Sequence, residues 1–342
     1  FRKKINIMLL LKNILFIFLL SPIFFIELII YKIFKKNCSY ISHQYIIRFF
    51  SLTGGRSITL IDNFIKEKKK ISFNNTNKNF NNFSINNTIK ELNFNGYSIN
   101  KDFLEDEKIE KIINHLKNLN GRYSGDTVSN NSLSAFNLER NKISTRFTYE
   151  SNDLLEIPLI QKILLSDDIL KIAQEYLNSL PIIDIVTAWW TFPTEKSDKH
   201  GAQFWHFDMD RTKWLKVFIY LNDVNMDNGP HCFISKSHQD SGINYNIRKL
   251  GYSRIKDDKI EKYYNDEDIK YIVAKKGSIL FEDTRGLHKG LKVNKNSRLL
   301  LQFQYSTSLF GSKFKKLSLP RHQTTLFKEM KEKNPLMFQG FE

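Results

Sequence analysis

After Pro181 the chain divides into short runs rich in branched and aromatic residues, separated by turn-forming residues such as the Asp-Asn-Gly-Pro at 227–230. Short runs of this composition between turn signals are typical of strands in a sandwich or barrel. Seven runs have this character: 182–192, 203–208, 214–223, 231–234, 271–273, 277–281 and 297–305. The pattern predicts a mainly β core with flanking helices, arranged as a double-sheet jelly roll.

The residues before and around these runs predict the domain organisation. Apolar residues at helical spacing predict one helix over 104–116, with Asp102 as its cap, and another over 167–177, with Ser166 as its N-cap. We expect one domain over 88–310, with a polar, lid-like insertion at 239–270, and a C-terminal tail at 311–342. Residues 41–87 contain a Lys- and Asn-rich stretch and are expected to be a linker or extension.

The run Trp205-His206-Phe207-Asp208 offers two metal-binding side chains on one face of an expected strand, because alternate residues of a strand point the same way. Two histidines and one carboxylate that leave other positions open are typical of non-haem Fe(II) oxygenases. His288, after the run at 277–281, is the best third ligand. The sequence therefore predicts that His206, Asp208 and His288 form a catalytic metal site.

Arg298 follows His288 by ten residues and opens an apolar run. An arginine in such surroundings needs an anionic partner, and a guanidinium binds a carboxylate through two parallel hydrogen bonds. The far carboxylate of 2-oxoglutarate is a suitable partner, so Arg298 is predicted to bind this co-substrate.

Other interpretations of these residues remain open at this point. A lone His-x-Asp occurs by chance, so His206 and Asp208 could form a hydrogen-bonded pair, and Arg298 a structural salt bridge. The same three ligands could hold zinc in a hydrolase, or the barrel could be a non-catalytic metal- or ligand-binding protein. His231 and His200 are candidate substrate contacts, with a solvated loop histidine as the default interpretation.

Several ordered motifs resemble the phytanoyl-CoA dioxygenase family of Fe(II)/2-oxoglutarate oxygenases. They are the block ending in His206 and Asp208, the run 216–224, Asn228-Gly229-Pro230, 235–238, the run 277–281 leading to His288 and Arg298, and the opening 96–99. The resemblance covers about residues 88–310. It implies a double-stranded β-helix, or cupin-like jelly roll, with iron at its open mouth.

The resemblance also implies the chemistry. Fe(II), 2-oxoglutarate and O2 are the expected cofactor and co-substrates, with ascorbate as a supporting reductant, and a C–H bond is hydroxylated with release of succinate and CO2. The family usually has glycine where Lys236 stands, so a different loop conformation is expected there. Halogenating relatives replace the metal carboxylate by a small residue, and the presence of Asp208 favours hydroxylation.

Further candidates for contact with 2-oxoglutarate come from alternation along the expected strands. One face of the run 214–223 carries Lys216, Phe218 and Tyr220. The alternative interpretation for each of them is ordinary packing within the strand. We also consider Gln203 and Thr191 as candidates, either for contact with the co-substrate or for hydrogen bonds that orient the metal ligands.

Residues 8–34 are strongly apolar and are interrupted by Lys12, Ser21, Pro22, Glu27 and Lys32. The length suits a membrane span, but a glutamate is costly in lipid and a proline bends a helix. A transmembrane anchor, a segment lying in the membrane interface and a helix packed on the protein itself are therefore all kept as interpretations. No small-residue cleavage site clearly follows, which disfavours a secretory signal.

The net charge of +16 is concentrated near the start of the chain. Residues 1–80 hold 14 Lys and Arg against three acidic residues, a balance of +11. No nucleic-acid-binding motif accompanies this charge, so a membrane surface along residues 8–36 fits it better, with a compositional bias toward Lys, Asn and Ile as the alternative. Two cysteines favour a reducing compartment, and a cytoplasmic protein with a small-molecule or lipid-like substrate is expected.

Overall fold

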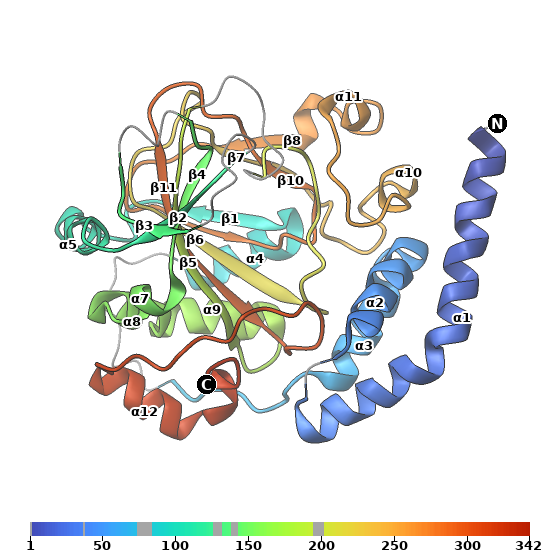
Figure 1. Ribbon diagram of the computed structural model, residues 1–342, viewed down its shortest axis with the longest axis horizontal. Coiled ribbons are helices and arrows are strands. Elements are labelled where there is room, and N and C mark those ends of the chain that lie inside the picture. The colour runs from blue at the N-terminus through green and yellow to red at the C-terminus, as the bar shows by residue number, and fades with distance from the viewer. Residues whose placement is uncertain (1, 37, 74–83, 126–131, 138–142, 194–201) are drawn as a thin grey trace.

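The computed structural model describes residues 2–36, 38–73, 84–125, 132–137, 143–193 and 202–342. Its core is a pair of antiparallel sheets (Figure 1). The larger sheet has the strand order β1-β9-β6-β11-β5-β4-β2-β3, and the smaller has the order β10-β7-β8. This architecture confirms the predicted mainly β jelly roll with flanking helices.

The strands of the larger sheet are β1 (Tyr97–Asn100), β2 (Gly121–Ser124), β3 (Leu133–Ser134), β4 (Arg146–Tyr149), β5 (Ile182–Thr191), β6 (Trp214–Tyr220), β9 (Ile279–Glu282) and β11 (Arg298–Ser306). Those of the smaller sheet are β7 (His231–Ile234), β8 (Ile269–Ile272) and β10 (His288–Gly290). Six of the seven predicted runs coincide with strands to within a few residues. The run 203–208 does not form a regular strand, because only isolated bridges join it to its neighbours, although its side chains still alternate.

The larger sheet has two differently packed faces, because successive side chains on a strand point to opposite sides. On β6, Val217 and Ile219 contribute to the main core that the helices cover. Phe218 and Tyr220 point the other way and pack with Phe233 of the smaller sheet. The space between the two sheets is therefore the interior of the jelly roll.

The outer face of the larger sheet is covered by a layer of helices. They are α4 (Ile85–Asn95), α5 (Asp106–Leu116), α7 (Ser151–Leu155), α8 (Pro158–Leu164), α9 (Asp167–Leu177), α12 (Thr325–Lys333) and the 3-10 turn η2 (Pro335–Phe338). Helix α9 has the predicted bounds, with Ser166 at its N-cap position. The cap prediction for Asp102 is wrong, because α5 begins later and Glu105 occupies its N-cap position.

Residues 41–65, expected to be part of an extension, fold as helices. Helix α1 (Arg2–Phe34) bends near its middle, where Pro22 interrupts the helical hydrogen bonds (Figure 1). Helices α2 (Tyr40–Thr53) and α3 (Arg56–Ile65) pack against it. Together the three helices cover the outer face of the smaller sheet, where Phe50 contacts Phe207 with 5.4 Å between ring centroids.

The insertion at 239–270 contains α10 (Tyr245–Arg248), α11 (Asp257–Ile260) and the 3-10 turn η1 (Asp266–Asp268). The turn leading into it contains Lys236, whose φ is +67°, the left-handed conformation that glycine adopts most easily. Lys236 thus adopts a conformation suited to glycine, the residue that the family usually has here, and the expected difference in loop conformation stays a prediction.

Candidate metal centre

Three side chains from separated segments meet in the interior of the jelly roll. His206 and Asp208 lie on the bridged segment that follows the undescribed residues 194–201, and His288 is the first residue of β10. One ligand atom from each lies within 4.8 Å of the other two, and each residue is about 5% exposed. The structure thus brings together the three residues that the sequence predicts to bind metal.

The backbone fixes this meeting point. The amide of His206 donates to the carbonyl of His288 at 3.0 Å, and the amide of His288 donates back at 2.8 Å. The amide of Asp208 donates to the carbonyl of Thr284 at 2.8 Å. Phe207, between the two ligands, points into the core under α2, so alternation along the segment directs both ligands inward.

Both imidazoles are oriented to offer Nε2 to a cation. Nδ1 of His206 donates to the carbonyl of Phe204 at 2.8 Å, and Nδ1 of His288 donates to the carbonyl of Gly286 at 3.0 Å. Because a carbonyl only accepts, each Nδ1 carries the proton and each Nε2 keeps its lone pair. Burial lowers the pKa of both histidines, which favours the neutral form that binds metal.

Lys216 neutralises the carboxylate of the triad. Its Nζ donates to Oδ2 of Asp208 at 2.6 Å and lies 3.2 Å from Oδ2 of Asp210. Burial alone would raise the pKa of Asp208, but the Lys216 ammonium and the two neighbouring histidines together hold this pKa well below its ordinary value. In the structure Lys216 therefore pairs with the aspartates, while its predicted contact with 2-oxoglutarate stays a prediction.

Two neutral imidazoles and one ionised carboxylate, converging on one point of the interior, fit Fe(II). This donor set is the two-histidine, one-carboxylate combination of non-haem iron enzymes, and it lacks the thiolates that soft metals prefer. The arrangement leaves one side of a bound ion to be occupied by other ligands.

Arg298 opens β11 of the larger sheet, two residues before Leu300, which packs between the two sheets, and it lacks a carboxylate partner among the described residues. It is 3% exposed, it donates to the carbonyl of Gly229, and its Nε has no partner. Thr191 stands directly opposite it on β5, and Arg146 on β4 is opposite Thr191 in turn. Burial lowers the pKa of Arg146 to about 10, and the charge of Arg298 adds to the effect. Two neighbouring guanidinium groups with no carboxylate partner in the described part of the chain form a site suited to an anion.

The remaining predicted contacts lie around this site. Tyr220 is buried and its hydroxyl has no hydrogen-bond partner among the residues that the structure describes. Phe218 packs edge-on against His231 with ring centroids 4.7 Å apart. Gln203 is buried three residues before His206. Phe218 and Tyr220 lie between the two sheets, whereas for Gln203 the structure shows only burial, and the contact of each of these residues and of Thr191 with 2-oxoglutarate stays a prediction.

The structure also contains interior groups that the sequence did not reveal. His231 is 8% exposed, and its Nδ1 lies 2.7 Å from Oε2 of Glu282, which is fully buried. The default interpretation of His231 as a solvated loop residue is therefore wrong. Glu282 faces Lys216 across the β6–β9 pair, so alternation along the run after Gly277 was the signal that could have identified it. His200 lies outside the described residues.

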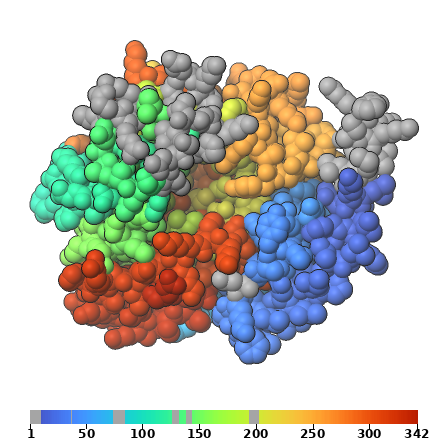
Figure 2. Space-filling model, in the orientation of Figure 1, coloured from blue at the N-terminus to red at the C-terminus, as the bar shows by residue number. Residues whose placement is uncertain are grey.

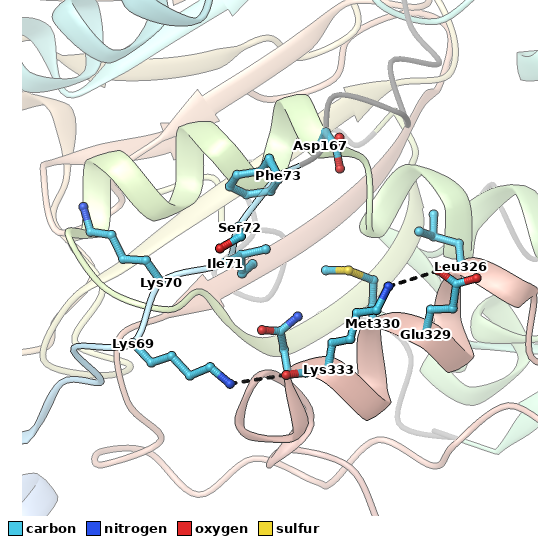
Figure 3. Close-up of a pocket in the computed structure, with 11 residues that line it drawn as sticks. Lys69, Lys70, Ile71, Ser72, Phe73, Asp167, Leu326, Glu329, Met330 and Lys333 are labelled. Atoms are coloured by element: carbon cyan, nitrogen blue, oxygen red, sulfur yellow. Dashed lines mark hydrogen bonds and ion pairs between the residues drawn. The ribbon is translucent and has the colours of Figure 1, made fainter.

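A surface pocket elsewhere in the protein is unrelated to this centre. Figure 3 shows it between residues 69–73 and α12, where Lys69 donates to the carbonyl of Lys333 at 3.3 Å. None of the residues that line it is a predicted site residue.

Comparison with known families agrees with this geometry. The model of the phytanoyl-CoA dioxygenase family matches residues 92–298, which is more than half of the chain. The chain belongs to the phytanoyl-CoA dioxygenase family. Membership in this family, with the donor set described above, identifies an oxygenase-type enzyme dependent on iron and 2-oxoglutarate. No curated protein matches the chain by sequence.

Several solved structures resemble this member of the phytanoyl-CoA dioxygenase family at low identity. HygX from Streptomyces hygroscopicus, with nickel and 2-oxoglutarate bound, is 14% identical with a TM-score of 0.48, covering 71% of this chain and 93% of its own. EctD from S. alaskensis, in its apoform, is 12% identical with a TM-score of 0.47, covering 77% and 88%. The α-ketoglutarate-dependent epimerase SnoN from nogalamycin biosynthesis is 10% identical with a TM-score of 0.45, covering 65% and 82%.

Proposed function

We propose that this protein is an Fe(II)- and 2-oxoglutarate-dependent hydroxylase that oxidises a C–H bond of a small or lipid-like substrate. The observation that carries the proposal is the meeting of His206, Asp208 and His288 within 4.8 Å, in a protein whose buried Arg298 has no carboxylate partner among the described residues and leaves its Nε without a hydrogen bond. A zinc hydrolase would use the same three ligands but would leave Arg298 without a role.

In this proposal the three ligands hold iron, and Arg298 binds the far carboxylate of 2-oxoglutarate, with the unpartnered hydroxyl of Tyr220 as a second donor. Bound iron, together with 2-oxoglutarate and O2, supplies the oxidising power, with succinate and CO2 as by-products. The protein's own contribution is to position the metal ligands and the co-substrate. The carbonyls of Phe204 and Gly286 fix the imidazole planes of the two histidines.

The walls of the interior exclude water from the reacting groups. Phe218, Leu280 and Leu300 are each at most 3% exposed and surround the space between the ligands and Arg298. A dry interior of this kind strengthens the charged contacts to a bound co-substrate. The retained carboxylate of Asp208 supports hydroxylation over halogenation, because halogenation needs a free position on the metal where this ligand stands.

The test measures iron content and succinate formation in the purified protein supplied with Fe(II), ascorbate and 2-oxoglutarate. We expect about one iron per wild-type chain, and iron-dependent succinate formation. The variant His206→Ala should lose both while keeping the circular dichroism of the wild type, because one of only three protein ligands is removed. His115→Ala, which changes an exposed histidine on α5, is the matched control and should retain both.

Full iron occupancy in His206→Ala would remove this residue from the site. A wild-type protein that binds iron but forms no succinate with any substrate pool would favour a non-catalytic binding protein instead. Incorporation of one oxygen atom from O2 into the oxidised product would identify the reaction as hydroxylation.

A further inference from the structure

Helix α1 exposes an unusually large apolar surface. Of residues 10–34, only Phe24, Leu28 and Tyr31 are buried in the protein. The exposed side chains recur at helical spacing along one face of the helix: Leu11, Ile14, Leu15, Phe18, Leu19, Ile23, Phe25, Ile26, Ile29, Ile30, Ile33 and Phe34. Soluble monomers rarely expose contiguous apolar surface of this extent, so the face is expected to be covered by a partner.

The opposite face of α1 is firmly attached to the protein. Phe24 and Tyr31 are at most 1% exposed, and Phe24 stacks on Tyr45 of α2 with 4.1 Å between ring centroids. The hydroxyl of Tyr31 accepts a hydrogen bond from the amide of Leu309 at 2.7 Å, next to the end of β11. The helix is thus part of the folded domain and is not surrounded by solvent on all sides.

Two of the polar groups that interrupt the apolar stretch, Ser21 and Glu27, turn toward the protein, whereas Lys12 is exposed. The carboxylate of Glu27 accepts from the amide of Ser39 at 2.8 Å, at the start of α2. The hydroxyl of Ser21 donates to the carbonyl of Ile17 at 2.7 Å and lies 3.2 Å from the hydroxyl of Tyr45. The charge of Glu27 therefore does not oppose contact between the exposed face and lipid, because Glu27 does not lie on that face.

The charges around α1 are of one sign at the surface. Each acidic side chain of residues 10–70 is bonded within the protein: Glu27 to Ser39, Glu67 to Lys35, and Asp62 to Thr212 and Thr307. The exposed charged side chains of the described part of this segment are all basic: Lys12, Lys36, Arg56, Lys68, Lys69 and Lys70, of which Lys70 lies 3.6 Å from the carboxylate of Glu175. An apolar face bordered by basic groups is complementary to a bilayer that contains anionic lipid.

We propose that the exposed face of α1 binds the surface of an anionic bilayer, with the helix lying in the membrane interface. A helix lying in the interface needs one apolar face and one polar face, and here the protein attached to α1 replaces the polar face. A helix that crosses the bilayer would need lipid contact all around, which the attachment of Phe24 and Tyr31 prevents. A second copy of the chain fits less well, because a two-fold contact would bring the same basic groups together.

Attachment through α1 would also orient the enzyme. The amide of Ser241 donates to the carbonyl of Gly54 at 2.6 Å, and Nε of Arg248 donates to the carbonyl of Ser51 at 2.9 Å, so α2 is joined to the insertion at 239–270. The insertion pairs in turn with Trp205, next to the predicted ligand His206. The bilayer would lie on the side of the molecule where α1–α3 and the insertion adjoin (Figure 2).

The test is flotation of the full chain with phosphatidylcholine vesicles, with and without phosphatidylserine. We expect the wild type to float with the vesicles that contain phosphatidylserine. The double variant Phe18→Glu/Ile26→Glu, which charges side chains that are 77% and 58% exposed, should lower the bound fraction by about tenfold or more. Met226→Glu/Val273→Glu adds the same charge at side chains of the catalytic region that are each 48% exposed and should bind like the wild type.

Succinate formation without vesicles should be equal in all three proteins, so that a loss of floating is separated from a loss of folding or of the proposed activity. Wild-type protein that floats with neither kind of vesicle would overturn the proposal. Equal floating with both kinds would overturn the role of the basic groups, and resistance to alkaline extraction would overturn the interfacial position. A dimer in solution that Phe18→Glu/Ile26→Glu dissociates would assign the face to a second copy.

Discussion

Replacing Arg298 with leucine should separate two effects of its buried charge: its effect on the stability of the ligand-free protein and its effect on the binding of 2-oxoglutarate. Without ligand, this guanidinium donates to the carbonyl of Gly229, has an unpartnered Nε, and has Arg146 nearby. A buried donor without a partner costs about 1–3 kcal/mol. We therefore expect ligand-free Arg298→Leu to be as stable as the wild type, or more stable by up to about 2 kcal/mol, because leucine restores apolar packing without the charge.

The effect of 2-oxoglutarate should be the opposite. At a concentration of 100 times its dissociation constant, the ligand stabilises the wild type by about 2.7 kcal/mol, which corresponds to a rise in Tm of about 5 °C. Losing a buried charge pair costs about 3–5 kcal/mol, so the dissociation constant should rise by two to four orders of magnitude. The same ligand concentration should then leave the Tm of Arg298→Leu unchanged.

The assay is thermal unfolding of the Mn(II)-loaded protein, with and without 2-oxoglutarate, monitored by circular dichroism. Arg298→Lys is the matched control, because it keeps the charge but loses the two-pronged geometry, and it should show an intermediate shift. A variant Arg298→Leu with the full ligand-induced shift would refute the reasoning. So would a loss of more than about 3 kcal/mol in the ligand-free variant, since the guanidinium would then be a structural group.

Two further predictions concern folding. Burial alone would raise the pKa of Asp283, but Arg285 outweighs it and lowers this pKa to about 2, so the carboxylate contributes about 2 kcal/mol that is present above pH 4 and lost as the pH falls through 2. Asp283→Asn should lower the free energy of unfolding by about 3–5 kcal/mol near neutral pH, because Arg285 is left buried without its partner. Urea titrations between pH 2 and 7 should show that this variant loses less stability on acidification than the wild type does. The control Asp223→Asn, which removes an exposed ion pair, should behave like the wild type. Gly277→Ala should destabilise the fold by about 2 kcal/mol or more, because φ is +83° and a Cβ would lie 2.3 Å from the carbonyl oxygen of Leu104; a denaturation midpoint equal to that of the wild type would contradict this.

Part of the site was predictable because it depends on local spacing. Alternation along an extended chain places His206 and Asp208 on one side whether or not the segment is a regular strand, and the chain after Ser166 has the apolar spacing of a helix that needs one buried face. Arg298 stood out because a charge within an apolar run needs a partner. These inferences require only the geometry of the backbone and the cost of burying a charge.

Other features depend on which segments meet. Three contacts join residues that are distant in sequence or whose orientation follows from packing. They are the contact of His231 with Glu282, the position of Arg146 beside Thr191 and Arg298, and the attachment of Glu27 to the start of α2. The left-handed conformation of Lys236 is likewise imposed by the surrounding turn. The sequence by itself determined most of the strands, the helix after Ser166 and the side chains predicted to bind metal, because these follow from local periodicity. Only the tertiary structure decided which charges are paired and which face of α1 stays uncovered, because strand register and helix docking arise from contacts among the whole chain.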